Sequence, residues 1–557
     1  MKAIKILFSL FCSVLVLASC SDFLEEKPQA ILNEEEVNDP DKVVTSVYSD
    51  LGNDHYTTPM SLWPYGTVRS DDAYKGGSGA NDIQEFHFFE TSTNITTDIG
   101  AVDELWFQCY RAISRSNTAL RILNGLDDSQ PSKNTRIAET RFLRGHFYFL
   151  LKILFKNIPY IDETVAVEDY GTISNVALTN DELWAKIADD FQYATDNLPE
   201  TQIEKGRANK YAAAAYLAKT YLYKAYRQNE NHTVTGIDAA DLQKVLTYTD
   251  LVIGSRYNLE ADFAFNFLPG DFENGEEAIF SVQYSQNDGT KFGRLNFGDL
   301  LSTPMKLGCC DFHKPSQSLV NAFSTVNGLP NFDSYNTNAS GISAKADPRL
   351  FHTVALPGMP YKYNTTLIYE EDWNRNPDFY GVYASLKENV DPSCDCFVHL
   401  DPFYANSKNR ILIRYADVLL MRAEAFIELK QESEALPLIN QVRNRAKNST
   451  LYIDYAQDKL EIALYPNTNW TYAFAQQALR WERRLEFAME GGRFFDLVRW
   501  GIADQVMNEY YQAESSRRSY YSGATFSKSK HEYVPIPENQ IKFSKYLYKQ
   551  NPGYGGN

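Results

Sequence analysis

Apolar residues recur along most of this chain with the 3.6-residue period of amphipathic helices. The clearest stretch is 103–123, where Leu105, Trp106 and Cys109 fall on one side. The same period predicts further helices over 136–155, from 179 to just before 199, over 212–222, 242–253, 412–426 and 435–443, and in a final pair over 474–491 and on to 506.

Small residues occupy the positions where several of these helices are expected to cross. The alanines at 212–215 form one such face, and Ala416 and Ala423 contribute to another. Small side chains let two helices approach closely. Repeated helix pairs with small residues at the crossing are the tetratricopeptide pattern in degenerate form, so we predict a mainly α fold with a helical-repeat scaffold of about four helix pairs.

Residues 261–407 lose the helical period and are rich in Gly, Pro, Asn, Tyr and Phe. An irregular, loop-rich insertion carried by a rigid frame is where binding usually lies, with a structural cap over open helix ends as the alternative. We therefore expect a single domain over 20–557. Within it we expect a helical frame at roughly 30–260 and 408–505, a ligand-facing half at roughly 261–407 and a C-terminal cap over 506–557.

The N-terminus has the features of a lipoprotein signal peptide. Lys2 and Lys5 precede an apolar run over 6–16, and small residues precede Cys20. The run is shorter than the roughly 20 residues of a membrane-spanning helix. We therefore predict that residues 1–19 are removed and that Cys20 is lipidated, the alternative being an ordinary secretory signal with an incidental cysteine. The acidic residues that follow resemble the surface-export tag of lipoproteins from Bacteroidetes-type bacteria; they are Asp22, Glu25 and Glu26.

The net charge of the chain argues against some classes of binding partner. Cleavage of the signal peptide removes two lysines, so the net charge of −18 becomes −20. Such an acidic chain is repelled by phosphates and by anionic lipid, which argues against nucleic acid and against a polybasic membrane contact. No other apolar stretch approaches spanning length, so lipid on Cys20 is the only membrane attachment that we expect.

Glu482, Glu486 and Glu490 recur every four residues on one predicted helix face. Like charges at this spacing repel each other unless cations answer them. We predict a buried or half-buried ion network that holds the last helix pair, formed with the residues nearby in sequence: Arg483, Arg484, Arg493, Arg499 and Asp496. Arg414 with Asp417 is likewise interpreted as a helix-packing contact.

Eight short blocks of the chain have recognisable motifs: RFLRGHFY at 141–148, GRA at 206–208, RYADVLLMRAEA at 414–425, INQVRNRA at 439–446, ERRLEF at 482–487, EGGRFFDLVRW at 490–500, PIP at 535–537 and NPGY at 551–554. In this order they resemble the SusD/RagB family over essentially the whole mature chain. Gly145 departs from the pattern, since the family more often has alanine there.

The resemblance implies a lipid-anchored protein of the outer membrane and the cell surface, with four degenerate tetratricopeptide units and an irregular ligand-binding half. Such proteins capture oligosaccharide or polysaccharide and act as the lid of a SusC-like TonB-dependent transporter, without being enzymes. Some branches bind peptides instead, and a RagB-like peptide-import lipoprotein is therefore the alternative. A purely structural lid is a third interpretation.

A glycan site needs aromatic faces for the apolar side of a sugar ring, and carboxylates, amides and arginines for its hydroxyls. Two loop regions combine these side chains, and packing inside the loops is the alternative for each of them. Candidates from the first region are Trp63, Tyr65, Arg69, Asp71, Asp72 and Tyr74. Candidates from the irregular half are Tyr284, Asn287, Phe292, Cys309, Cys310, Trp373, Arg375, Tyr380, Tyr383 and Tyr404.

Five cysteines remain besides the lipidated one, and outside the cytoplasm they could oxidise. We favour a vicinal disulfide between Cys309 and Cys310, which would form a rigid turn able to pack against a sugar ring. Cys394 and Cys396 are then paired with each other or free, and cross-pairing of the two segments is the alternative. The odd cysteine, Cys109, is expected to be a free thiol on an apolar helix face.

The cysteines, histidines and acidic residues give little indication of a metal site or a catalytic site. The two cysteine segments lie near His313 and His399, which makes a zinc site an alternative, but neither has the C-x2-C spacing typical of zinc. We predict no metal and no cofactor, leaving open a structural Ca²⁺ held by loop carbonyls. Nothing resembles a phosphate loop or a nucleophile elbow. A glycoside hydrolase is a remote alternative, because a pair of carboxylates could be hidden among the 72 acidic residues.

Overall fold

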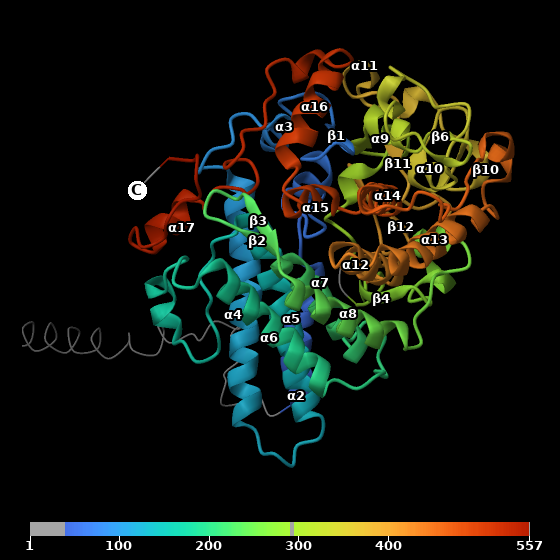
Figure 1. Ribbon diagram of the computed structural model, residues 1–557. Coiled ribbons are helices and arrows are strands. Elements are labelled where there is room, and N and C mark those ends of the chain that lie inside the picture. Colours follow the sequence, from blue (N-terminus) through green and yellow to red (C-terminus); the bar gives the residue numbers. More distant parts are fainter. Residues whose placement is uncertain (1–38, 290–293, 556–557) are drawn as a thin grey trace, which may run out of the picture.

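The molecule has a helical part and an irregular part. The computed structural model describes residues 39–289 and 294–555. Long helices stand side by side in the lower part of Figure 1, while short helices, short strands and loops fill its upper right. Within the described ranges, no helix is long and apolar enough to cross a membrane. The predicted mainly α fold is confirmed.

The α-helices are α2 (Pro40–Tyr48), α3 (Gln84–Thr91), α4 (Gly100–Gly125), α5 (Lys133–Phe155), α6 (Asn180–Asn197), α7 (Lys210–Ala225), α8 (Ala239–Ile253), α9 (Gln317–Ala322), α10 (Arg349–Thr353), α11 (Pro377–Tyr380), α12 (Tyr415–Glu428), α13 (Glu432–Asn448), α14 (Tyr472–Glu486), α15 (Arg493–Arg499), α16 (Ala503–Ser515) and α17 (Glu538–Phe543).

The strands are β1 (Ala73–Gly76), β2 (Tyr226–Gln228), β3 (Val234–Ile237), β4 (Ala278–Val282), β5 (Phe312–Pro315), β6 (Thr325–Val326), β7 (Leu329–Pro330), β8 (Val354–Ala355), β9 (Pro360–Tyr361), β10 (Asn364–Ile368), β11 (Ala384–Ser385), β12 (Phe397–Leu400), β13 (Phe403–Asn406) and β14 (Arg410–Arg414). In the part of the chain that the structure describes they form antiparallel pairs only: β1–β5, β2–β3, β4–β14, β6–β7, β8–β11, β9–β10 and β12–β13.

Two of the long helices, α6 and α7, begin at a residue whose side chain caps the helix N-terminus. The Thr179 hydroxyl accepts a hydrogen bond from the Glu182 N–H (3.2 Å), and the Glu182 carboxylate accepts one from the Thr179 N–H (2.8 Å). At the start of α7 the Asn209 side chain accepts from the N–H groups of Tyr211 and Ala212. The start predicted for α6 is therefore confirmed.

The alanine face predicted on α7 lies inside the helical frame. Residues 212–215 are fully buried, and α7 packs between α6 and α8. α8 in turn packs on α12, and α12 packs on α13 and α14. Helix pairs from the two ends of the chain thus form one stack, which confirms the predicted helical-repeat scaffold.

Three local predictions differ from the structure. Leu412 lies on β14, which pairs with β4, and the helix begins only at Tyr415. α16 crosses the boundary predicted between 505 and 506. β1, expected in the helical frame, pairs with β5 of the irregular half. The two differences that involve β14 and β1 come from strand pairs between distant segments, which local periodicity does not show.

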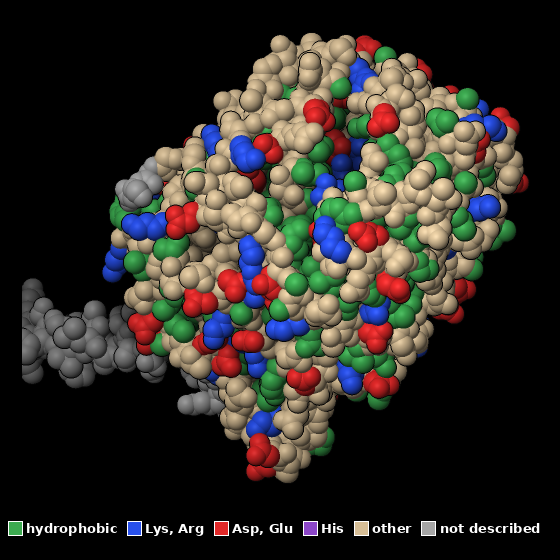
Figure 2. Space-filling view, in the orientation of Figure 1, with side chains coloured by type: hydrophobic (Ala, Val, Ile, Leu, Met, Phe, Trp, Pro, Cys, Tyr) green, Lys and Arg blue, Asp and Glu red, His purple; other side chains and the backbone are tan. Residues whose placement is uncertain are grey.

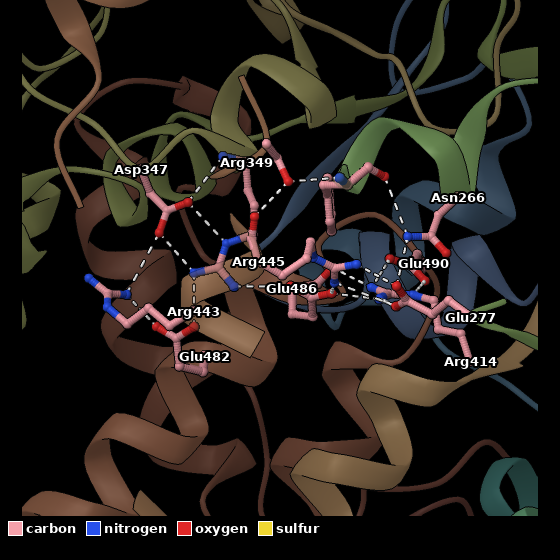
Figure 3. Close-up of polar contacts among 12 residues, drawn as sticks. Asn266, Glu277, Asp347, Arg349, Arg414, Arg443, Arg445, Glu482, Glu486 and Glu490 are labelled. Atoms are coloured by element: carbon pink, nitrogen blue, oxygen red, sulfur yellow. Dashed lines mark hydrogen bonds and ion pairs between the residues drawn. The ribbon is translucent and has the colours of Figure 1, made fainter. Parts of the chain in front are cut away.

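Glu482 and Glu486 are buried and Glu490 is half-buried in an ion network, but the cations of this network were predicted wrongly (Figure 3). Glu482 pairs with Arg349 at 2.9 Å, and Glu490 pairs with Arg414 at 2.9 Å. Glu486 receives the most contacts, from Arg349 (3.1 Å), Arg414 and Arg445. The glutamates therefore form ion pairs with four arginines that are distant in sequence: Arg349, Arg414, Arg443 and Arg445.

The arginines that neighbour the glutamates in sequence pair with other acids. A residue one position along a helix points about 100° away, so Arg483 and Arg484 face different neighbours from Glu482. Arg414 contacts the glutamates and not Asp417, so that predicted contact is also wrong. The observed pairs are Arg483 with Asp417 and Asp496, Arg484 with Asp71 and Asp72, Arg493 with Asp71, and Arg499 with Glu424 and Asp496.

Three buried histidines make stability depend on pH. Burial lowers the pKa of His146, of His232 and of His531 to about 3 in each case. In the unfolded chain their pKa is about 6.5. Between these values the unfolded chain binds protons that the folded chain does not, so the free energy of unfolding falls as pH falls below about 6.5. Each histidine contributes up to about 1.4 kcal/mol per pH unit in this window.

We therefore expect a lower urea midpoint at pH 5 than at pH 7. His232→Gln is the matched variant, because the His232 Nδ1 lies 2.8 Å from the Lys156 ammonium and a glutamine oxygen accepts a hydrogen bond without titrating. This variant is expected to show a shallower pH dependence. Equal midpoints at the two pH values would contradict the assignment of neutral buried histidines.

Candidate ligand-binding surface

A turn made of adjacent cysteines lies where several segments meet. Cys309 and Cys310 are joined by a vicinal disulfide across a cis peptide bond, and Cys309 is half-buried. The next residue, Asp311, holds the turn: its carbonyl accepts from the Gly77 N–H (2.9 Å) and its carboxylate accepts from the Arg375 N–H (2.7 Å). The accessible side of the turn is thus held in one position.

One strand pair brings the two predicted loop regions together. In β1–β5, Tyr74 lies opposite Lys314 and Gly76 lies opposite Phe312. The Trp63 ring stacks on the His313 ring, with centroids 5.1 Å apart and planes 26° apart. Residues around position 70 therefore support the turn near position 310.

Three rings of the β12–β13 hairpin lie beside the turn. Phe397, His399 and Tyr404 share one face: the Tyr404 centroid is 4.8 Å from that of Phe397 and 4.4 Å from that of His399, with nearly parallel planes. Gly308 packs against this face, since a Cβ there would lie 1.9 Å from a Tyr404 ring carbon. The His399 side chain is 54% exposed and the other two are half-buried. We call Phe397, His399 and Tyr404 the aromatic ledge.

A second disulfide closes the base of this hairpin. Cys394 and Cys396 are bonded to each other just before β12. The Gln286 side chain donates to the Asp395 carbonyl at 2.6 Å, which places the segment with the exposed Asn287 beside the hairpin. Phe292 and Cys20 lie outside the described residues.

Most of the residues predicted from the sequence are buried beneath this surface. The Trp63 indole N–H donates to the Gly298 carbonyl (3.0 Å). Arg69 donates to the His531 carbonyl (2.7 Å) and lies 4.5 Å from the Phe494 ring centroid. The buried candidates are Trp63, Tyr65, Arg69, Asp71, Asp72, Tyr74, Tyr284, Cys310, Trp373, Tyr380 and Tyr383.

The buried aromatic candidates have partners inside the protein. Tyr74 donates to Glu514 (2.6 Å). Tyr383 donates to the Gln317 side chain (3.0 Å). Trp373 belongs to a small separate core beneath the loops, formed with Ala355, Tyr361, Tyr369, Ala384 and Leu386. These side chains position the loops and do not face solvent.

Among the candidates, Cys309, Arg375 and Tyr404 keep accessible surface, and the exposed Asn287 lies nearby. The Arg375 guanidinium pairs with Asp82 at 2.9 Å while 32% of its side chain stays exposed. Since the Arg375 N–H binds Asp311 and Tyr404 contacts Gly308, these groups flank the cysteine turn on both sides. An aromatic face, a disulfide and a guanidinium therefore share one surface.

Charges beneath the surface are compensated. Burial lowers the pKa of Lys75 to about 8, and its ammonium donates to the Gly79 carbonyl at 2.9 Å. Burial raises the pKa of Asp311, although Lys314 at 2.6 Å opposes the shift. On the face shown in Figure 2, acidic and basic side chains are interspersed and form no single basic patch.

The zinc alternative is wrong, because its four thiolates are consumed in the two disulfides. His313 is buried against Trp63 and paired with Glu388. Across the described ranges, no group of three or more His, Cys, Asp or Glu side chains is arranged to hold a metal ion. Cys109 is a free, buried thiol.

Sequence reasoning missed two of the ledge residues, Phe397 and His399. A signal was present: the two alternate on a short strand, and a turn containing Asp401 and Pro402 returns the chain to Tyr404. Reading this segment as a hairpin would have placed all three rings on one face.

The geometry defines a class of protein: a helical-repeat scaffold that carries a partly exposed aromatic surface on disulfide-bonded loops. Two family models match the sequence, one described as SusD family over residues 276–554 and one described as starch-binding associating with outer membrane over residues 22–222. The chain belongs to the SusD family, as the sequence motifs predicted.

Relatives and solved structures agree with this assignment. SusD-like protein P2 of Formosa agariphila is 26% identical over the full length of both chains. A SusD-like carbohydrate-binding protein from Bacteroides fragilis has a similar structure, with a TM-score of 0.71, 23% identity and coverage of 90% of this chain and 97% of that one. A laminarin-binding SusD-like protein has a TM-score of 0.65 at 22% identity, covering 92% of this chain and 99% of that one. The similarity of these structures establishes the fold.

Proposed function

We propose that this protein is a non-catalytic glycan receptor of the cell surface that passes oligosaccharide to a SusC-like TonB-dependent transporter. The observation that carries the proposal is the aromatic ledge beside the Cys309–Cys310 turn and Arg375. Family membership supports it, since one similar structure is named for carbohydrate binding and another for laminarin.

The ledge suits the chemistry of a sugar. The apolar face of a pyranose packs on aromatic rings, and a guanidinium donates several hydrogen bonds to hydroxyls. The His399 ring and the Arg375 side chain are exposed on the two flanks of the turn, so one chain of sugar residues can contact both. The half-buried Cys309 of the disulfide lies between them.

The arrangement of carboxylates supports a receptor and not a hydrolase. A glycosidase needs two carboxylates that flank the scissile bond and reach the substrate. Glu277 and Glu486 share the partners Arg414 and Arg445, but both are fully buried and neutralised. Asp71 and Asp72 are likewise held by Arg484 beneath the surface.

Retention of the protein in native gels that contain dissolved polysaccharides tests the proposal. We expect slower migration in at least one gel of a panel that includes β-glucans, α-glucans, mannans and pectins. A mixture of oligopeptides run as a competing ligand provides the contrast. Binding of peptides with no retardation by any polysaccharide would favour the peptide-import alternative and overturn the glycan proposal.

We propose further that lipid on Cys20 holds the receptor at the outer membrane. Cys20→Ala is expected to move the protein from the membrane fraction to the soluble fraction, because its described helices offer no membrane-spanning segment. Polysaccharide retention of the released protein is expected to be unchanged. Continued sedimentation of Cys20→Ala with washed membranes would contradict lipidation as the anchor.

A further inference from the structure

A cavity of about 180 Å³ lies between the helical frame and the irregular half, and none of the three ledge residues lines it. Its walls come from α5 and α7 on one side and from β14 and the residues before α15 on the other. At about 30 Å³ per water molecule, this volume corresponds to roughly six waters. It is large enough for one sugar ring.

Several buried polar atoms of the cavity wall have no hydrogen-bond partner among the described residues. They are Nε and Nη1 of Arg410, Oδ1 of Asn266 and Nε2 of His313. His313 is 1% exposed and Asn266 is 9% exposed. A buried polar atom without a partner loses the hydrogen bond that it would make in water, so such groups are normally satisfied by a ligand or by ordered water.

The charged side chains of the same wall already have partners inside the protein, among them Lys408, which donates to the Lys387 carbonyl. Lys387 pairs with Glu490 (2.7 Å), and Lys219 pairs with Asp417 (3.2 Å). His313 contacts Glu388, and Arg410 lies 3.5 Å from an Asp54 carboxylate oxygen without a hydrogen bond. What is left over is therefore hydrogen-bonding capacity, both donor and acceptor, and not net charge. Hydroxyl groups match this mixture because each can donate and accept.

The rest of the wall is apolar and partly aromatic. Trp63, Phe149 and Phe495 line it, and Trp63 is held in place by its stack on His313. A sugar ring has one apolar face and a rim of hydroxyls, which is the combination that this wall offers. Water alone would leave the aromatic faces without a partner of matching shape.

We propose that this cavity is a second binding site, for a single neutral sugar ring or a polyol of the same size. The site is independent of the aromatic ledge and of the glycan held there. Its position between the two parts of the molecule means that an occupant contacts both of them.

Gly492 offers a way to close the cavity without strain. It lines the wall at the N-cap of α15, its φ is −99°, and a Cβ built there meets no atom within 4 Å. We expect a leucine at this position to extend into the open space beside the wall. Gly236 on β3 is the matched control, because a Cβ there also meets nothing within 4 Å and the residue is exposed.

The test is isothermal titration of D-glucose, D-galactose, D-mannose and D-glucuronate into the native protein, Gly492→Leu and Gly236→Leu. At least one neutral hexose is expected to bind with a dissociation constant on the order of 1 mM or tighter. Gly492→Leu is expected to weaken that binding at least about tenfold, while Gly236→Leu leaves it unchanged. Polysaccharide retention is expected to be the same for all three proteins, which separates this site from the ledge.

Three results would overturn the proposal: no hexose binds the native protein, Gly492→Leu binds as tightly as the native protein, or only the charged glucuronate binds. If circular dichroism shows that Gly492→Leu is not folded, Gly492→Ala replaces it. The smaller side chain is expected to weaken hexose binding by a smaller factor, and unchanged affinity of folded Gly492→Ala, together with displacement of hexose by soluble polysaccharide, would assign the binding to the ledge.

Discussion

Glu486→Gln is expected to lower the free energy of unfolding by about 3–5 kcal/mol, the range found when one partner of a buried ion network is removed. Glu486 is fully buried and contacts Arg349, Arg414 and Arg445. Burial alone would raise the pKa of Glu486, but Arg445, Arg414 and Arg349 outweigh it and hold that pKa well below its usual range. Glutamine keeps the shape and removes the charge, so three arginines remain buried with too few anions.

Urea unfolding followed by circular dichroism measures this loss, with Glu538→Gln as the control. Glu538 pairs with Lys542 on α17, but its side chain is 49% exposed, so its removal is expected to cost about 0.5 kcal/mol or less. A Glu486→Gln variant as stable as Glu538→Gln would show that the network does not stabilise the junction of α14 with β14, α10 and α13.

The second large effect is expected at the ledge. Tyr404→Ala should weaken glycan binding by about 1–2 kcal/mol, which is about five- to thirtyfold in the dissociation constant. Two reasons support this size. The Tyr404 ring stacks with Phe397 and His399, and it also contacts Gly308 beside the cysteine turn, so its loss removes the ring that joins the other two and loosens its neighbours.

Two variants separate ligand contact from general damage. Tyr404→Phe keeps the ring and is expected to bind within about threefold of the native protein, because the stacking surface is retained. Tyr546→Ala removes a ring that is 60% exposed on the segment after α17, and it is expected to have no effect. If the Tyr404→Ala variant binds glycan as tightly as the Tyr546→Ala variant, the aromatic ledge has no role in glycan binding.

The helical frame could be predicted because helical periodicity is visible within short stretches of sequence. The period of 3.6 residues located α4 to α8. It also predicted a helix that begins near Thr179, which is the N-cap of α6. Leu412 was misplaced since β14 exists only through its pairing with β4, a segment more than a hundred residues earlier. Tertiary pairing overrides local periodicity at such positions.

The ion network shows the same limit for side chains. The spacing of Glu482, Glu486 and Glu490 predicted that cationic side chains pair with them, and each of the three forms an ion pair. The identity of those cations depended on which distant segments pack on α14, and Arg349 is 133 residues from Glu482. A sequence can show that glutamates need cationic partners, but it does not show which arginines those partners are.

For the candidate site, composition located the loops but not the exposed faces. An aromatic residue in a loop can point inward or outward, and Trp63, Trp373 and Tyr380 point inward. Cys309, Arg375 and Tyr404 keep accessible surface, while the ledge residues Phe397 and His399 needed the hairpin register to be recognised. Burial is set by the whole fold, which is why residue type alone overestimates the number of ligand contacts.

Hydrogen exchange with and without a retained polysaccharide shows directly whether the cysteine turn and the aromatic ledge bind glycan. We expect slower exchange of backbone amides over residues 305–311 and 394–406, the cysteine turn and the hairpin of the aromatic ledge, with no change in α4 to α8. Slower exchange confined to the helical frame, with these two segments unchanged at saturating polysaccharide, would contradict the assignment of this surface to glycan binding.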